Sequence, residues 1–464
     1  MRFALPPISD FIRPRTAAAA VLAVGCIVTS VVNYPGILEN DSFEQLLEGR
    51  RGRYAFWHPP VMSWLLGLSD WATPGAGIYV VVLTVLTFAA LISLLWLVPR
   101  VSWAAVVGAV LFACLPQLFL FQATVWKDVL FADACLIGFV CLAHAAARWQ
   151  KRRWRFAMLG LGAAFIALAL LARQNGFVIL PCAALALTIV AWRSDASARK
   201  AAVYGAGLLV VVAAAAFAGY AGLRTHSDGS NADRVLVKYL RLYDITGMVE
   251  LRPDIKLTVL EKHSPRMARL VRTDGVRLFS PLMNDTLEYS APLMEALDAT
   301  TPEVVANQWR ALILEHPGTY LTLRADLFRW VFSPPDVALC NPFQVGADGT
   351  AADLKALGTR PRMDNRDMAL WRYANTFVHT PVFSHPVYAL VALGALVFLL
   401  RRRRPADVAI AGLLAAVLLF TLSFFFISIA CDYRYIYALD LAAIAAAFYI
   451  LADPTKKGAR EGPL

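Results

Sequence analysis

The sequence predicts an all-α membrane protein with about ten transmembrane helices and a large, mainly helical domain on the outer side of the membrane. Of the 464 residues, 59% are hydrophobic and 17% are charged, and the mean hydropathy is +0.56. Soluble domains are about half apolar and about a quarter charged. The apolar residues also come in long blocks, and a block of roughly 17–25 apolar residues is long enough to cross a bilayer.

Ten segments fit this length. They are Thr16–Val32, Ile78–Val98, Ser102–Phe121, Val129–Ala147, Phe156–Leu171, Gly176–Trp192, Ala201–Leu223, His385–Leu400, Asp407–Ile429 and Tyr433–Ala452. The first is similar to a signal peptide but lacks a convincing cleavage site, so it is predicted to be retained. Val61–Trp71 is too short to span, and we expect a juxtamembrane helix at the interface.

These segments divide the chain into three regions. We expect an N-terminal membrane module (1–223), an outer domain (224–384) and a C-terminal three-helix module with a tail (385–464). Within the outer domain, Pro302–Val331 is predicted to form two helices that break at His316-Pro317-Gly318. The stretch Ser264–Pro292, which is rich in Pro, Asp and Gly, is predicted to be a loop.

The basic residues give the orientation, because Lys and Arg concentrate on the cytoplasmic side of membrane proteins. All basic clusters fall on one side of the ten-span arrangement: Arg2/Arg13/Arg15, Arg100, 148–155, Arg193/Arg199/Lys200, Arg401–Arg404 and Lys456/Lys457/Arg460. We therefore expect a bacterial inner-membrane protein with both termini in the cytoplasm. The net charge of +11 is then an orientation signal, and no nucleic-acid partner is expected.

The polar stretch 34–60 follows the first predicted span and is the expected catalytic loop. It carries three acids, three arginines and one histidine: Glu39, Asp41, Glu44, Arg50, Arg51, Arg53 and His58. Charges beside a membrane are costly to keep and often functional. Asp41 fits a general base, but it also fits a helix N-cap with Glu44 at capping-box spacing. Both roles stay open.

Other charged residues are predicted at the same face. His58 fits a phosphate or substrate contact, or a turn that starts the juxtamembrane helix with proline in its first turn. Lys127 and Asp128 fit an interfacial ion pair, or a phosphate-binding lysine and a second acid. Arg173 lies in a tight turn, where it either snorkels to the interface or faces a polar cavity. Arg434 is expected at the outer end of a membrane helix, between Tyr433 and Tyr435.

The chemistry follows from this convergence. Cations at an outer membrane face bind a phosphate and stabilise a phosphate leaving group, while a carboxylate takes the proton of an acceptor. Nucleotide sugars are not present outside the inner membrane, so a lipid-linked sugar is the expected donor. The sequence therefore predicts a membrane glycosyltransferase.

Four motifs carry a family resemblance over roughly the first 180 residues: Asn40-Asp41-Ser42, His58-Pro59-Pro60, Asp128 and Arg173-Gln174-Asn175-Gly176. They are similar to motifs of the GT-C superfamily, and most closely of its bacterial protein O-mannosyltransferase and aminoarabinose-transferase branch. This resemblance implies inverting transfer from a polyprenyl-phosphate-linked sugar to a hydroxyl or phosphate acceptor. The family often has Asp-Glu where this chain has Asp41-Ser42, which weakens a two-acid or metal-assisted mechanism.

The sequence hypothesis assigns the roles as follows. Asp41 is the general base, and Lys127, Arg173 and Arg434 bind the donor phosphate. His58 and Asp128 shape the site, and region 224–384 recognises an envelope acceptor. No cofactor is required by the sequence, and a divalent cation stays open. Expected partners are the polyprenyl-phosphate sugar, membrane lipids and the acceptor.

Three rival functions remain. A polymerase or ligase of lipid-linked glycans also has outer arginines and many spans. A transporter or flippase is expected to carry charges near the midplane and internal repeats, and here Asp133 and His144 are the main charges within the middle spans. The third rival is a scaffold.

The seven cysteines allow two readings. Five lie in apolar blocks, where cysteine is usually a small hydrophobe. Cys340 and Cys431 lie in or near outward-facing segments, as a disulfide or as two free thiols. The Cys and His spacing does not match a metal-binding motif.

Overall fold

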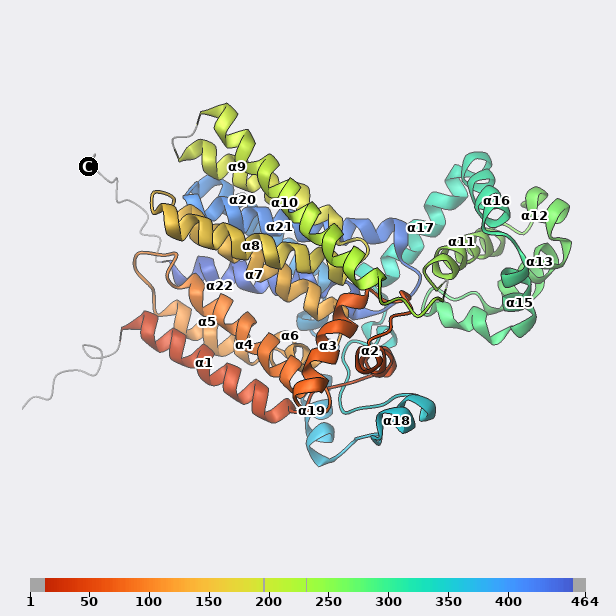
Figure 1. The fold of residues 1–464 in the computed structure, drawn as a ribbon, viewed down its shortest axis with the longest axis horizontal. Helices are drawn as coiled ribbons and strands as arrows, with labels where there is room; N and C mark the ends of the chain where they lie inside the picture. Colours follow the sequence, from red (N-terminus) through yellow and green to blue (C-terminus); the bar gives the residue numbers. More distant parts are fainter. Residues whose placement is uncertain (1–12, 195–196, 231, 454–464) are drawn as a thin grey trace, which may run out of the picture.

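A computed structural model describes residues 13–194, 197–230 and 232–453 (Figure 1). Nine of its described segments are long and apolar enough to cross a membrane: α1 (Pro14–Asn33), α4 (Gly77–Leu94), α7 (Lys127–Ala147), α8 (Arg152–Ala172), Gly176–Arg193, which includes α9 (Ile179–Arg193), α10 (Ala198–Arg224), α20 (His385–Arg402), α21 (Pro405–Ile427) and Tyr433–Ala452, which includes α22 (Tyr437–Ala452). The predicted all-α, multi-pass membrane fold is confirmed.

Helix α7 is the centre of this bundle. It is buried along nearly all of its length and packs against α4, α8, α21 and α22. The outer helices α1, α10 and α20 keep most of their apolar surface exposed, as expected for helices that face lipid. The N-terminal end of α7 is therefore fixed on all sides, and the residues there are held in a rigid part of the molecule.

The predicted span Ser102–Phe121 is wrong as a single helix. The chain forms α5 (Ala104–Ala113), then α6 (Pro116–Phe119) and a short 3₁₀ turn, and the two parts are bent by 66°. Pro116 has no N–H and disfavours a helical conformation at the residue before it, and Leu115 is extended. The bend directs the chain toward the start of α7.

The basic turns lie together at one end of the bundle. The α4–α5, α7–α8, α9–α10 and α20–α21 turns lie at the left end in Figure 1, and the lobe formed by α11 to α17 lies beyond the other end. The expected basic flanks at Arg2 and at Lys456, Lys457 and Arg460 lie outside the described residues. The charge asymmetry expected from the sequence is thus present in the described turns.

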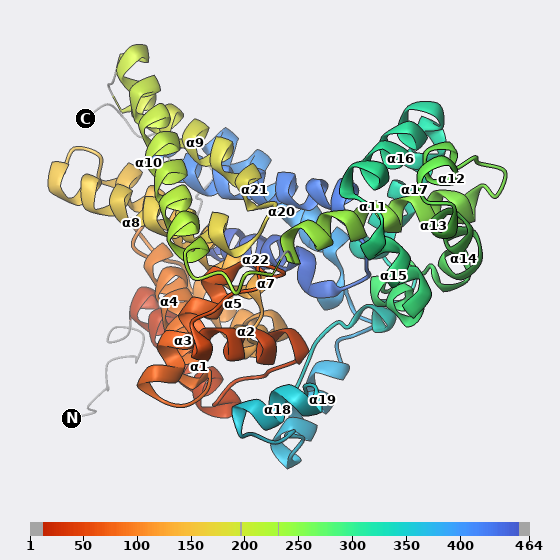
Figure 2. The same cartoon turned by 45° about the vertical axis from the view of Figure 1, so that its right-hand side comes forward.

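The helices of the lobe lie to one side of the membrane bundle (Figure 2), and the lobe has its own apolar core. It consists of α11 (Ala232–Leu251), α12 (Thr258–His263), α13 (Pro265–Leu270), a π turn (Val271–Gly275), α14 (Val276–Leu278), α15 (Ala291–Ala299), α16 (Pro302–Glu315) and α17 (Pro317–Phe332). The helix break at residue 316 is confirmed. The loop predicted over Ser264–Pro292 is wrong for its first half, because Pro265 begins a helix whose Met267 and Ala268 are buried.

Residues 333–384 return from the lobe to the start of the chain. They contain α18 (Ala351–Leu357) and α19 (Asn365–Asn375), and α18 packs against α2 (Asn40–Arg51). The Leu38 N–H donates to the carbonyl oxygen of Gly346 at 3.1 Å, and Arg362 donates to the carbonyl oxygen of Gly36 at 2.9 Å. The segment 333–384 therefore fixes the polar stretch that follows α1.

Two short helices of that stretch touch backbone to backbone. The predicted juxtamembrane helix is α3 (Pro60–Ala72), and it packs against α2. A Cβ atom at Gly49 would lie 2.1 Å from the Ser63 carbonyl oxygen, and one at Gly67 would lie 2.5 Å from the Gly49 carbonyl oxygen. Only glycine permits this approach, which sets the position of α2.

The structure decides between a disulfide and two free thiols for Cys340 and Cys431. Cys340 and Cys431 form a disulfide with their Cα atoms 4.8 Å apart, a normal separation for a disulfide. The bond joins the 333–384 segment to the turn before α22. Two distant parts of the chain are thereby tied together beside the cluster of charges described below.

We expect Cys431→Ser to lower the free energy of unfolding by about 2–5 kcal/mol, because a crosslink over a long loop restricts the unfolded chain. Thermal unfolding in detergent measures the change, with Cys114→Ser, an exposed free thiol, as control. Peptide mapping without reduction should recover the Cys340–Cys431 pair. Alkylation of both thiols in the native protein would contradict the bond.

Candidate active site

The start of α2 positions Asp41. Glu39 is the N-cap residue, and its N–H donates to Ser42 Oγ at 3.2 Å. Ser42 Oγ in turn donates to the Val125 carbonyl oxygen at 2.7 Å. The capping alternative for Asp41 is therefore wrong, because Glu39 and Ser42 form the cap. Asp41 is the second residue of the helix, and its carboxylate contacts Arg434 and lies near His58.

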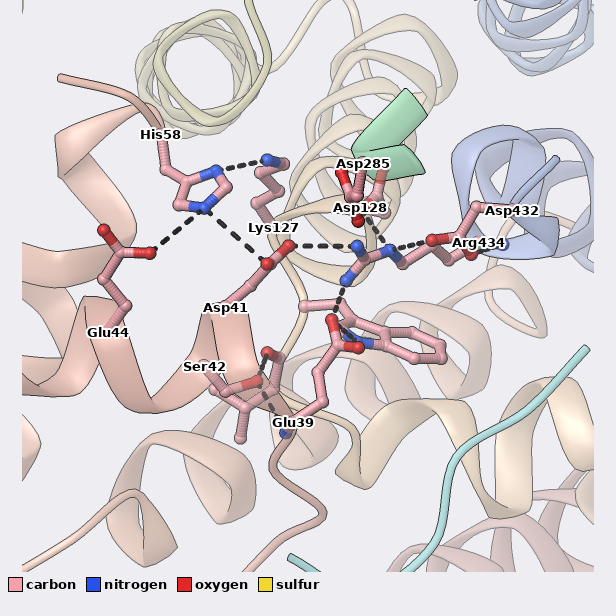
Figure 3. Close-up of polar contacts among 12 residues, drawn as sticks. Glu39, Asp41, Ser42, Glu44, His58, Lys127, Asp128, Asp285, Asp432 and Arg434 are labelled. Atoms are coloured by element: carbon pink, nitrogen blue, oxygen red, sulfur yellow. Dashed lines mark hydrogen bonds and ion pairs between the residues drawn. The ribbon is translucent and has the colours of Figure 1, made fainter. Parts of the chain in front are cut away.

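Arg434 is the centre of the charged cluster (Figure 3). It lies in the 3₁₀ turn η8 (Tyr433–Ile436) and is buried. Its guanidinium contacts Glu39, Asp41 at 2.9 Å and Asp432 at 2.7 Å. Asp128 lies 3.9 Å away. One guanidinium, with its five N–H donors, thus lies among four carboxylates. They come from residues 39–41, from residue 128 and from residue 432.

An aromatic side chain closes this centre from one side. The Trp126 ring lies 5.2 Å from the Arg434 guanidinium carbon, within the range of a cation–π contact. Its Nε1–H donates to Glu39 at 2.8 Å. Trp126 therefore orients both the cation and one of its acids.

Lys127 and Asp128 do not pair with each other. Asp128 forms a buried ion pair with Arg173, whose guanidinium also lies 5.4 Å from the Phe424 ring and 5.5 Å from the Tyr435 ring. The interfacial ion-pair alternative and the snorkelling alternative are both wrong, since Asp128 and Arg173 are buried. They belong to the same interior cluster as Arg434.

His58 connects Lys127 to the acids of α2. Lys127 Nζ donates to His58 Nδ1 at 2.6 Å. The other ring nitrogen, Nε2, lies 3.8 Å from Asp41 and 3.9 Å from Glu44. The six residues predicted from the sequence (Asp41, His58, Lys127, Asp128, Arg173 and Arg434) therefore form one connected network.

Sequence reasoning missed several members of this network. Glu39 was within the polar stretch but was given no role, although it precedes Asp41 by two residues. Asp432 is two residues before Arg434 in the Cys-Asp-Tyr-Arg motif that drew attention to the arginine. Trp126 is the residue before Lys127. Proximity to a chosen residue was the available signal in each case.

Charges and burial set the protonation states. Burial opposes ionisation of Asp41, but Arg434, followed by His58 and Lys127, outweighs it and holds the pKa of Asp41 well below its usual value. Burial and then Lys127 lower the pKa of His58 to about 3. At neutral pH, Asp41 is therefore a carboxylate and His58 is a neutral imidazole.

Two other acids behave in the opposite way. Burial raises the pKa of Glu39 to about 7 although Arg434 opposes the shift. Burial raises the pKa of Asp432 to about 6, again against Arg434. These acids exchange protons near neutral pH, and pKa values in that range are typical of functional sites.

We expect Glu44→Gln to change the pH dependence of stability. Glu44 is half-exposed, and its partial desolvation, followed by repulsion from Glu48 and Asp41, raises its pKa to about 7. A raised folded-state pKa stabilises the fold below the unfolded pKa, and this stabilisation is lost as pH rises through about 7. The variant should melt like wild type at about pH 4 and at a higher temperature than wild type at about pH 8. Equal differences at both pH values would contradict the assignment.

A cleft of about 350 Å³ adjoins Arg434 on the side of Glu39 and Asp432. Its lining combines carboxylates, amides and aromatic rings: Glu39, Asn40, Trp126, Asn341, Phe343, Gln344, Asp348, Gly349 and Asp432. Carboxylates and amides hydrogen-bond hydroxyl groups, and an aromatic face covers the apolar side of a ring. This lining suits a polyhydroxylated ligand better than an anion.

Among the residues that the structure describes, no three or more His, Cys, Asp or Glu side chains lie close enough together to hold a metal ion. The four acids at the centre surround the Arg434 guanidinium.

Solved structures of the archaeal oligosaccharyltransferase AglB from Archaeoglobus fulgidus are similar to this chain. The complex with an inhibitory peptide and a dolichol-phosphate has a TM-score of 0.41 and 16% identity, over 94% of this chain and 50% of that chain. The complex with Zn and sulfate has a TM-score of 0.40 and 16% identity, over 93% and 48%. The form tethered to an acceptor peptide containing the NVT sequon has a TM-score of 0.41 and 14% identity, over 94% and 49%.

The chain thus spans about half the length of these solved structures. No family model matches the chain, and no curated protein sequence matches it significantly.

Proposed function

We propose that this protein is an inverting glycosyltransferase that moves a sugar from a polyprenyl-phosphate-linked donor to an acceptor in the cell envelope. One observation carries the proposal. At the end of a membrane bundle opposite its basic turns, the ionised Asp41 shares a buried network with Lys127, Arg173 and Arg434. The network adjoins a cleft suited to hydroxyl groups.

The cations suit the donor phosphate. Lys127 uses one of its three donors on His58, so two remain for an incoming oxygen. Arg173 and Arg434 add positive charge within the same buried region, where electrostatic interactions are stronger than in water. The polyprenyl chain would lie along the apolar outer surface of the bundle. The similarity of the His58-Pro59-Pro60 and Arg173–Gly176 motifs to the O-mannosyltransferase and aminoarabinose-transferase branch agrees with such a donor.

The acids suit the transfer step. The acceptor hydroxyl forms a bond to the anomeric carbon while the bond from that carbon to the donor phosphate oxygen breaks. Asp41 takes the hydroxyl proton, and the cations stabilise the charge that develops on the leaving polyprenyl phosphate. Attack from the face opposite the phosphate inverts the anomeric carbon.

Two features support an outward-facing site in a bacterial inner membrane. The basic turns lie at the opposite end of the bundle, as expected for cytoplasmic turns. The Cys340–Cys431 disulfide lies at the end that carries the site, and disulfides form mainly in oxidising compartments outside the cytoplasm.

Mass spectrometry of envelope glycolipids and glycoproteins tests the proposal. Cells that lack the gene are compared with cells that carry wild type or Lys127→Met at equal protein level. We expect one glycan mass increment with wild type, and its loss in the deletion strain and the variant. Identical glycan profiles in all strains would contradict a transferase. A change in the length of a glycan chain, in place of a single added sugar, would favour a polymerase.

A further inference from the structure

The turn between α7 and α8 carries a cluster of basic and aromatic side chains far from the proposed active site. Five cations fall within residues 148–155, together with two tryptophans: Arg148, Lys151, Arg152, Arg153, Arg155, Trp149 and Trp154. The turn lies at the end of the bundle opposite the lobe (Figure 1). Nothing in the proposed transfer uses these residues.

This cluster differs from its neighbours in being unneutralised. At the same end of the bundle, Arg402 pairs with Asp407 at 2.6 Å and with Asp453 at 2.8 Å, and Arg404 also pairs with Asp453. Within the described chain, Lys151, Arg152 and Arg153 have no such acidic partner and are exposed. Their positive charge is available to a ligand from outside the protein.

An aromatic frame holds the cluster in place. The Arg155 guanidinium lies 4.8 Å from the Trp149 ring and 5.6 Å from the Tyr204 ring of α10, and it donates to the Trp149 carbonyl oxygen at 3.0 Å. Arg148 lies 4.8 Å from the Trp154 ring. Two of the five cations thus contact aromatic rings, and the other three are exposed.

The outward cations line a groove. It has a volume of about 620 Å³ and is bordered by Lys151, Arg152, Arg153, Trp154 and Ala157. Lys and Arg have apolar stems below their charged ends, so the groove has apolar walls and a cationic rim. Beyond it, α8 continues as a membrane-spanning helix with exposed apolar residues such as Phe156 and Leu161.

We propose that this groove binds the head group of an anionic phospholipid, with the phosphate at Arg152 and Arg153 and the acyl chains along α8. Basic pockets on the cytoplasmic side of membrane helices bind such head groups, and tryptophan prefers the level of the head groups. The apolar walls and the continuing helix match the acyl chains of a diacyl lipid, and a free phosphate ion has no such chains to bury there. The site is independent of the proposed glycosyl transfer.

The alternative is that the cations serve orientation alone. In that case the number of positive charges matters, and their position in the groove does not. Two double variants separate these cases, because each removes two exposed arginines from turns at the same end of the bundle. Arg152→Gln/Arg153→Gln alters the groove, and Arg100→Gln/Arg401→Gln leaves it intact.

Native mass spectrometry of the purified full-length protein in detergent makes the measurement. Phosphatidylglycerol, phosphatidylethanolamine and inorganic phosphate are titrated separately. We expect wild type and the Arg100/Arg401 variant to retain phosphatidylglycerol. The Arg152/Arg153 variant should bind it roughly 30-fold more weakly, the effect of two basic contacts at an anionic membrane surface. A thermal melt confirms that each variant is folded.

Four results would overturn the proposal. Equal loss of phosphatidylglycerol in both variants would show a general charge effect, and no loss in either would show that the groove is not the site. Equal retention of phosphatidylethanolamine, or competition by inorganic phosphate at equal concentration, would show that the ligand is not an anionic lipid.

Discussion

Replacing Asp41 by Asn should reduce sugar transfer by about 10²–10⁴-fold, the usual range for loss of a general base. The variant should fold, because Arg434 keeps Glu39, Asp432 and Asp128 as partners. Asn also retains the size of Asp and its place inside α2. Transfer is measured in membranes with a radiolabelled lipid-linked sugar and at matched protein level. The melting temperature of each variant is measured as well, to show that it is folded.

Glu39→Gln is the matched control for Asp41→Asn. Both acids contact Arg434, and both lie at the start of α2. Glu39 lines the cleft, and its pKa is raised to about 7, so it is the rival base. A larger loss in Glu39→Gln than in Asp41→Asn would move the catalytic assignment to Glu39. Full activity of Asp41→Asn would remove Asp41 from the mechanism.

The second large effect is expected at Arg434. Replacing it by Met leaves Glu39, Asp41 and Asp432 close together and without their shared cation. Removing one partner of a buried ion pair typically costs about 3–5 kcal/mol of folding stability. We therefore expect Arg434→Met to lower stability by about that amount and to abolish transfer. Denaturant unfolding in detergent gives the stability change.

Two further variants test this explanation. Arg50→Met removes an arginine that pairs with Asp70 near the surface, and exposed pairs contribute only about 0–1 kcal/mol. Adding Asp432→Asn to Arg434→Met should recover part of the lost stability, because one of the repelling carboxylates becomes neutral. A stable Arg434→Met protein, or no recovery in the double variant, would show that the cluster is not held by Arg434.

Much of the fold could be predicted from sequence because membrane spans are read from length and apolar composition. The bend at Pro116 could not, since the apolar run continues through residues 102–121 and hides the break. The helix that begins at Pro265 was missed because proline was taken as a loop signal, although it also suits the first turn of a helix.

The site was partly predictable for a different reason. Orientation alone brings the helix ends of one membrane face together, which is why Asp41, Arg173 and Arg434 could be grouped. Pairing needs distances, so Asp128 was not assigned to Arg173. The cleft depends on residues 341–349, which reach α2 only because the chain after the lobe folds back. The periodicity of the sequence does not indicate that this segment folds back onto α2.

The separation of Arg434 from its acids along the chain has a consequence for biogenesis. It follows Glu39 by 395 residues and Asp41 by 393, and Cys431 follows Cys340 by 91. Because a chain is synthesised from its N-terminus, Glu39 and Asp41 are made long before Arg434. They are also made long before the disulfide can close. The charged cluster around Arg434 therefore cannot assemble before the turn that precedes α22 has been made, and under the proposed function a shorter nascent chain would be inactive.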